Sequence, residues 1–170
     1  MPCLEYVAKN VGIRRAGTEW VLCTNVDSLL SPQMASRLVT AKLDPGIFYR
    51  ANRTNLGSDG IPIRFIKADE GAAGDFMMMR FKSWVTCCGY PEFVGDDTID
   101  SLMVELAKHY GLKQVVWPEP VYHQYHEPGR AGWPSLASRY KELLHKHNEY
   151  DQWGLETHDL QTRRTYSHAA

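Results

Sequence analysis

The feature that most constrains the fold is a short apolar run near the N-terminus, residues 20–23, which stops abruptly at the polar pair Asn25 and Asp27. The run predicts a buried strand, and a helix should follow it, because Ser31 is a good N-cap and Pro32 suits a first helical position. The polar pair has two interpretations. Asn and Asp both favour turns. In an extended chain, however, side chains two residues apart point the same way, and the pair would then offer oxygen ligands to one divalent cation.

Further along the chain, apolar periodicity predicts strands alternating with helices, which favours an α/β layered domain. The clearest helix, residues 98–110, has an apolar stripe at helical spacing. We expect the strand at residues 46–54 to lie at an edge, and Pro118 and Pro120 to kink the chain between two short strands. The other predicted strands are 19–24, 61–66, 74–81, 115–117 and 121–123, and the other predicted helices are 4–16, 32–43, a short one ending at Cys88, and 134–147.

Composition narrows the class of protein. A chain of 170 residues with 44% hydrophobic and 23% charged residues is long enough for one domain with a core. Its formal net charge of -1 gives no support for nucleic-acid binding. No signal peptide and no apolar run of membrane-spanning length is visible, so we expect a soluble, cytoplasmic protein. The four cysteines lack zinc or disulfide-framework spacing, and we expect free thiols.

Three polar clusters follow predicted strands or open a predicted helix. Each has an ordinary explanation when taken alone: a turn, acids that favour a helix N-terminus, or histidines on a surface or in a core. Their order, with strands between them, is more informative than any one of them. The clusters are Asn25 with Asp27, then Asp96, Asp97 and Asp100, then His123 with His126.

This order resembles the catalytic half of GT-A-fold glycosyltransferases of the family-2 type. The matching segments are residues 9–27, 71–93, 96–112 and 121–126, within a likeness that spans roughly residues 6 to 155. The resemblance implies a GT-A-like α/β sheet flanked by helices, with a partial glycosyltransferase domain at residues 1–150 and a peripheral tail at 151–170. The family places strand-helix-strand units that hold the nucleobase ahead of its metal motif. We therefore expect this chain to be N-terminally truncated.

The resemblance also assigns the metal and catalytic residues. In the family a buried strand ends in an Asp-x-Asp metal motif, and here Asn25 replaces the first acid. Asp27 is then expected to bind Mn²⁺ or Mg²⁺, together with His123 or His126, between which the sequence does not choose. Asp100 lies eleven residues before the helix-ending Gly111 and matches the catalytic base, with Asp97 as the second candidate.

The reaction explains why these residue types are needed. A nucleotide-diphosphate sugar, expected here to be a UDP type, has a leaving group whose negative charge a divalent cation neutralises. The hydroxyl of a sugar or glycan acceptor is a poor nucleophile, so a carboxylate must take its proton. A single base acting opposite the leaving group implies inversion at the sugar. The residues expected to contact donor or acceptor are Asp75, Arg14, Arg15, Trp84, Tyr90 and Trp133.

Two other functions fit the same residues. Asn25 and Ile99 stand where the family has acids, which favours a degenerate, non-catalytic module that binds a carbohydrate or a nucleotide. A metal-dependent hydrolase using Asp27, Asp97 and His123 is the third hypothesis. Binding without turnover would indicate the first of these two, and release of free sugar without an acceptor the second.

Overall fold

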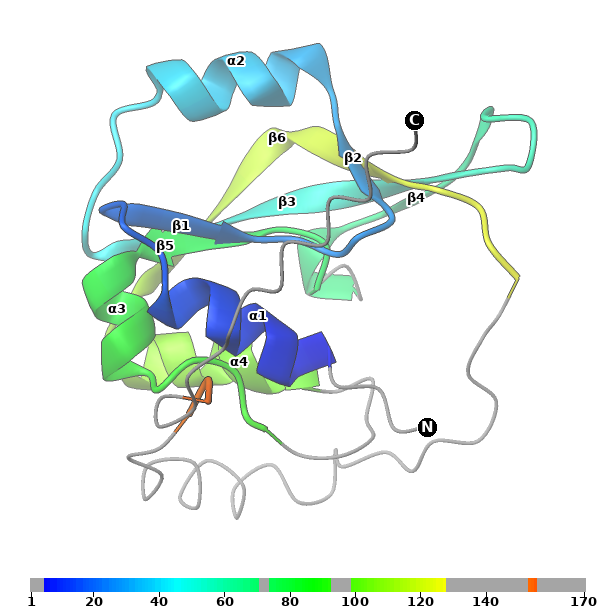
Figure 1. Cartoon of the computed structure of the whole chain (residues 1–170). Helices are drawn as coiled ribbons and strands as arrows, with labels where there is room; N and C mark the ends of the chain where they lie inside the picture. The colour runs from blue at the N-terminus through cyan, green and yellow to red at the C-terminus, as the bar shows by residue number, and fades with distance from the viewer. Residues whose placement is uncertain (1–4, 71–73, 93–98, 128–152, 156–170) are drawn as a thin grey trace, which may run out of the picture.

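A computed structural model describes residues 5–70, 74–92, 99–127 and 153–155. Within them, a six-stranded mixed sheet lies between α2 on one face and α1, α3 and α4 on the other (Figure 1). The predicted helix 134–147, Asp97 and Trp133 lie outside the described residues. The elements are α1 (Glu5–Arg14), β1 (Trp20–Cys23), β2 (Ser28–Leu30), α2 (Pro32–Thr40), β3 (Ile47–Leu56), β4 (Pro62–Ile66), a 3-10 turn (Ala68–Glu70), β5 (Met77–Arg80), α3 (Phe81–Thr86), α4 (Ile99–His109) and β6 (Lys113–His123).

The start of α2 forms as its sequence predicts. The Ser31 side chain accepts a hydrogen bond from the backbone N–H of Met34 at 3.0 Å, and Pro32 occupies the first turn. Met34 is fully buried and anchors this helix to the sheet. The segment from β1 to α2 is therefore fixed at both ends, which holds the polar turn between β1 and β2 in place.

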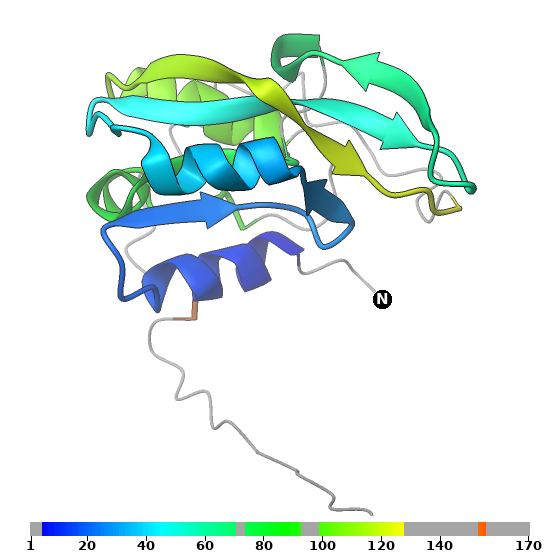
Figure 2. The same ribbon diagram turned by 90° about the horizontal axis from the view of Figure 1, so that it is seen from above.

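The strands run in the order β1-β5-β3-β6-β2. Strand β3 pairs in parallel with β6 and antiparallel with both β5 and β4, so it is central, and the prediction that it lies at an edge is wrong. Its partner β6 comes some sixty residues later, so local sequence could not reveal the pairing. Figure 2 shows the β3–β4 hairpin projecting past the helices, where Ile61, Ile63 and Phe65 are exposed.

Strand β6 is continuous across Pro118 and Pro120, where we expected a kinked connection between two strands. Its register against β3 shifts between Ala51 and Arg53, and no residue of β3 or β2 pairs with residues 118–120. The two prolines therefore lie where no ladder bond needs a backbone N–H. The short strand β2 was not predicted, because three residues directly after a turn carry too little periodicity.

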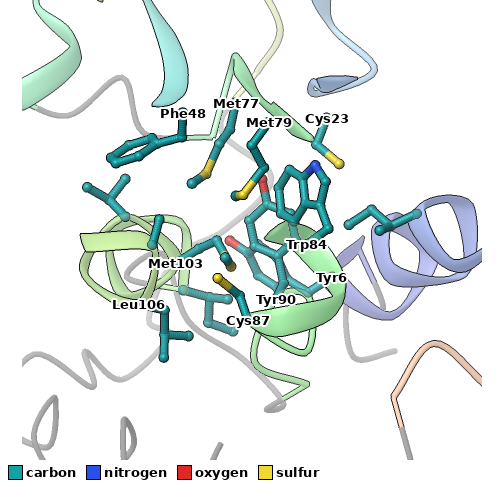
Figure 3. Close-up of a cluster of buried hydrophobic side chains, with 14 of the residues drawn as sticks. Tyr6, Cys23, Phe48, Met77, Met79, Trp84, Cys87, Tyr90, Met103 and Leu106 are labelled. Atoms are coloured by element: carbon teal, nitrogen blue, oxygen red, sulfur yellow. The ribbon is translucent and has the colours of Figure 1, made fainter. Parts of the chain in front are cut away.

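Two clusters of buried side chains fill the layers. One lies under α2 and includes Met34, Tyr49 and Trp117. The other lies between the sheet and helices α1, α3 and α4, where methionines and aromatic rings pack together (Figure 3). The expected free thiols are found at Cys23 and Cys87, which are both buried, and burial raises the pKa of each to about 12.

Three residues of the expected tail, Trp153–Leu155, are described, and they pack against α1. Trp153 is 3% exposed and belongs to the core cluster. The Arg14 guanidinium lies 4.5 Å from the centre of its ring, and Arg15 donates to the Gly154 carbonyl at 3.1 Å. This part of residues 151–170 thus contributes to the core. Among the described residues, no helix is long and apolar enough to cross a membrane.

Candidate metal and acid–base site

Pairing between β2 and β6 brings the polar turn after β1 next to the histidines. Ser28 pairs with His123, and the backbone N–H of Gln124 donates to the Asp27 carbonyl at 2.9 Å. Val26 at the tip of the turn is fully exposed, so the turn borders solvent. Residues almost a hundred positions apart in sequence are thereby held side by side.

Asp27, His123 and His126 form one cluster. The Nε2 atom of His126 lies 3.1 Å from one Asp27 carboxylate oxygen, and Nδ1 of His123 lies 3.6 Å from the other. The two imidazole rings are 5.2 Å apart between centres. One ligand atom from each of the three residues lies within 4.8 Å of the other two. Three potential ligand atoms therefore lie close together, and each histidine provides one of them.

The donor set of this cluster fits a divalent cation. The Oδ1 atom of Asp27 is buried, and no described residue donates a hydrogen bond to it. A buried carboxylate oxygen without a donor is costly, and a bound cation would satisfy it. One carboxylate with two imidazoles suits Mn²⁺ better than Mg²⁺, because Mg²⁺ prefers oxygen ligands. The three side chains are half-buried or exposed, so the cluster borders solvent.

Asn25 does not share this cluster's contacts. The prediction that Asn25 and Asp27 face the same way assumed an extended chain, but these residues form a turn in which the Ser28 N–H donates to the Asn25 carbonyl at 3.2 Å. The Asn25 side-chain oxygen instead accepts a hydrogen bond from Lys9 at 2.8 Å. A metal-ligand role for Asn25 stays a prediction, which this hydrogen bond does not favour.

Asp75 connects four segments beside the cluster. Its carboxylate accepts from Ser28 Oγ at 3.2 Å and from Arg53 at 3.0 Å, and it lies 3.2 Å from Nδ1 of His123. Its backbone carbonyl accepts from the Thr24 hydroxyl at 2.7 Å. The Asp75 side chain is 1% exposed. Asp75 therefore holds neighbouring residues of the site in place and is not part of the surface that a ligand would contact.

Asp100 lies against the residue before Asp75. A Cβ atom placed on Gly74 would be 2.2 Å from an Asp100 carboxylate oxygen, so a larger residue at position 74 would displace that carboxylate. Asp100 also accepts a hydrogen bond from Tyr6 Oη at 3.3 Å. The neighbouring residues 74 and 75 thus contact the predicted base and the histidine cluster, respectively.

Lys9 links Asp100 to Asn25. Its ammonium group bonds Asn25 and Glu5, each at 2.8 Å, and lies 3.6 Å from Oδ1 of Asp100. Burial acts to lower the pKa of Lys9, but Asp100 and Glu5 outweigh it and the pKa is raised. Lys9 is therefore charged, and it faces the predicted catalytic base.

Burial raises the pKa of Asp100, and the Lys9 charge offsets only part of that effect. Glu5 raises the pKa further, whereas the Tyr6 hydrogen bond lowers it. The Oδ1 atom of Asp100 is buried without a hydrogen-bond donor among the described residues. A carboxylate with a raised pKa and an unsatisfied oxygen is a better proton acceptor than an exposed aspartate.

The remaining predicted contact residues lie elsewhere. Trp84 and Tyr90 are fully buried in the core, with ring centres 5.3 Å apart, so neither ring offers a face to a sugar. Trp84 also donates from its indole N–H to the Val21 carbonyl at 3.1 Å. Arg14 and Arg15 are engaged with residues 153–155, as described above, rather than with the Asp27 cluster.

The sequence argument missed two residues beside the site, Lys9 and Arg53. Lys9 stands within the first segment of the family resemblance, but one lysine on a short helix gives no signal of its own. Arg53 belongs to none of the polar clusters that the sequence singles out. Its partner Asp75 lies just before β5, and a pairing of that kind is visible only in three dimensions.

A separate cavity of about 200 Å³ lies at the C-terminal end of β5. Arg80, Lys82, Tyr110 and Leu112 are among its lining residues, and it contains none of the residues predicted for the site. Arg80 at its rim is already paired with Glu19 at 2.9 Å. This cavity is therefore separate from the residues around Asp75.

No protein-family model matches the chain, and no curated protein matches its sequence. The fold is similar to the solved catalytic domain of Drosophila beta1,4-galactosyltransferase 7 in complex with xylobiose, with a TM-score of 0.56 and 13% sequence identity. The match covers 86% of this chain and 61% of that chain, so this chain spans about three-fifths of that domain's length. At this identity the likeness shows the fold alone. The expected α/β fold is confirmed, and a glycosyltransferase catalytic domain has a similar fold.

Proposed function

We propose that this chain carries the catalytic half of a metal-assisted glycosyltransferase that moves a sugar from a nucleotide-diphosphate donor to an acceptor hydroxyl. One observation carries the proposal: of two neighbouring residues, Gly74 lies against Asp100, a buried acid with a raised pKa, and Asp75 contacts His123 of the cluster of Asp27 with two histidines. Glycosyl transfer with inversion needs a proton acceptor close to, but distinct from, a cation that faces the leaving group.

In this proposal Asp27, His123 and His126 hold Mn²⁺, or Mg²⁺ with lower affinity. The cation would supply Lewis-acid neutralisation of the charge that develops on the departing diphosphate. The Asp27 turn borders solvent, so a UDP-type donor would approach from that side. The similar fold of a galactosyltransferase catalytic domain supports donor chemistry of this kind.

Asp100 is the proposed base, and Asp97 the second candidate. Asp100 takes the proton of the acceptor hydroxyl as that oxygen attacks the sugar carbon from the face opposite the diphosphate. Lys9 lowers the pKa of Asp100 against the larger effect of burial, because an adjacent cation favours the charged carboxylate. The fold neighbour was solved with xylobiose, and by analogy we propose a sugar or glycan acceptor here. Trp133 is the aromatic residue that we keep as a candidate to stack on it.

Binding of UDP with and without Mn²⁺ tests the cation site. We expect Mn²⁺ to increase UDP affinity at least about tenfold by calorimetry, and Asp27→Asn to remove that increase. Asp59→Asn is the matched control, because Asp59 is an exposed acid in the β3–β4 turn, far from the histidines in sequence. Equal UDP affinity with and without Mn²⁺ would contradict the site.

Acceptor-dependent release of UDP from a panel of UDP-sugars tests transfer itself. We expect release to need both Mn²⁺ and a sugar acceptor. The contacts of Lys9 favour a second function: because Lys9 neutralises Asp100 and occupies Asn25, the chain could bind donor or carbohydrate without turnover. Tight Mn²⁺-dependent UDP binding without release from any donor would support that non-catalytic module.

A further inference from the structure

We propose that Asp75 is a positioning residue for His123, holding the imidazole in the tautomer that presents Nε2 to the cation. This inference rests on the cation site of the proposed function. The sequence had instead suggested that Asp75 contacts the donor or the acceptor. Three features of its surroundings argue for the positioning role.

The first feature is burial. The Asp75 side chain is 1% exposed, so no sugar or nucleotide can reach its carboxylate without displacing protein. One carboxylate oxygen lies within 3.2 Å of both Ser28 Oγ and His123 Nδ1, and the other lies 3.0 Å from Arg53. Both oxygens are thus occupied by groups of the chain itself.

The second feature is charge. Arg53 is ion-paired with Asp75 at 3.0 Å. An ionised carboxylate only accepts hydrogen bonds, so the 3.2 Å contact requires a proton on Nδ1 of His123. In neutral histidine that leaves the lone pair on Nε2.

The third feature is the place of His123 in the site. Metal-binding histidines usually donate their other ring N–H to a carboxylate or a carbonyl, which fixes the ring and raises the basicity of the ligand nitrogen. Two carboxylates lie near Nδ1 of His123, and Asp75 at 3.2 Å is closer than Asp27 at 3.6 Å, so Asp75 is the hydrogen-bond acceptor in that relation. The Nδ1 of His126 lies 3.0 Å from the Glu127 carbonyl. Each histidine thus has its own orienting group, and that of His123 is charged and buried.

The tautomer of His123 gives a direct test that requires neither metal nor substrate. In ¹⁵N NMR spectra of the wild-type chain, at a pH where imidazole is neutral, we expect His123 to carry its proton on Nδ1. In Asp75→Asn we expect that preference to be lost. A wild-type His123 protonated on Nε2 would overturn the inference, even if the variant did not fold.

Mn²⁺ affinity, measured by electron paramagnetic resonance, gives the second readout. Removing an orienting group typically costs about 10- to 100-fold in metal affinity, and we expect that loss in Asp75→Asn. Ser28→Ala is the matched control, because it removes another hydrogen bond to the same Asp75 oxygen and leaves His123 in contact. We expect this control to stay within about threefold of wild type, with thermal unfolding measured for both variants.

The possible results separate this inference from the proposed function. If the wild-type chain binds Mn²⁺ and Asp75→Asn binds it equally well, the positioning role is wrong and the cation site stands. Equal losses in Asp75→Asn and Ser28→Ala would also overturn the role, because they would reflect general loosening of the turn. If the wild-type chain binds no Mn²⁺, both the cation site and the inference fail.

Discussion

Two neighbouring residues of α1, Lys9 and Asn10, organise two buried polar networks that differ in one respect. Every donor and acceptor of the Asn10 amide is satisfied: it bonds the Tyr90 backbone N–H and C=O, each at 2.7 Å, and a Glu92 oxygen at 2.8 Å. The same Glu92 oxygen accepts the Gly154 N–H at 2.8 Å. This network ties α1 to the chain after α3 and to the C-terminal segment.

The Lys9 network is incomplete by comparison. Lys9 reaches Glu5, Asn25 and Asp100, yet one oxygen of Asp100 is buried without a hydrogen-bond donor among the described residues. Completed polar networks make a fold rigid, whereas an unsatisfied buried acid costs stability and is typical of functional sites. We therefore propose that Asn10 stabilises the fold, whereas Lys9 and Asp100 take part in the proposed reaction.

The largest expected effect comes from Asp100→Asn. A positioned general base typically contributes about 10²- to 10⁴-fold in rate, so turnover should fall by that factor while Mn²⁺-dependent UDP binding is kept. Glu105→Gln is the control, since Glu105 is an exposed acid of the same helix, paired with Lys108. Steady-state kinetics and calorimetry measure the two quantities. Full turnover by Asp100→Asn would exclude it as the base and direct attention to Asp97.

Asn10→Ala should show the opposite pattern. It leaves the backbone groups of Tyr90 and one Glu92 oxygen short of partners in the core, so the free energy of unfolding should fall by about 2–4 kcal/mol. The measurement is denaturant unfolding, with UDP and Mn²⁺ affinities checked under conditions where the variant is folded. Loss of UDP or Mn²⁺ binding in a folded Asn10→Ala chain would contradict a purely structural role for the Asn10 network.

Lys9→Met should change the pH dependence of turnover. Lys9 lowers the pKa of Asp100, so removing the charge should raise that pKa further. Because the base must be ionised, the acid limb of the pH–rate profile should move to higher pH. Lys9→Arg, which keeps the charge, should move it less. An acid limb unchanged in Lys9→Met would mean that Asp100 is not the titrating group.

A smaller effect is expected in the pH dependence of stability. Because the native pKa of Asp100 is raised, its contribution to stability is fully present below the ordinary value of 3.8 and is lost as pH rises through the native pKa. The unfolding free energy of wild type relative to Asp100→Asn should therefore fall above pH 3.8, by at most about 1.4 kcal/mol per pH unit. Denaturant unfolding at several pH values measures it. A difference in unfolding free energy that grows with pH would show instead that the Lys9 charge outweighs the effect of burial on Asp100.

The sequence predicted most elements whose signals are local. Ser31 and Pro32 marked the start of α2, and the apolar stripe of residues 98–110 marked α4, as the structure confirms over Ile99–His109. Elements that depend on distant pairing were missed or misplaced. Strand β3 proved to be central, and Pro118 and Pro120 lie inside β6, because neighbouring strands decide which backbone groups need partners.

In the candidate site, too, the sequence identified some residues, whereas their contacts depend on the folded chain. Asp27 and the two histidines were singled out through the family resemblance, and the structure does bring these three residues together. The environment of each residue was not predictable. Burial made Trp84 and Tyr90 core residues and removed Asp75 from the surface that a ligand would contact, and only the folded chain brings Lys9 next to Asp100.

The central claim is that a cation bound by Asp27 and the histidines faces the same space as Asp100. A crystal structure of the whole chain with Mn²⁺ and UDP tests it most directly. We predict Mn²⁺ coordinated by Asp27 and the two histidines, a diphosphate oxygen in an open position, and the Asp100 carboxylate turned toward the donor. Mn²⁺ bound elsewhere, or UDP on a face that Asp100 does not share, would contradict the account.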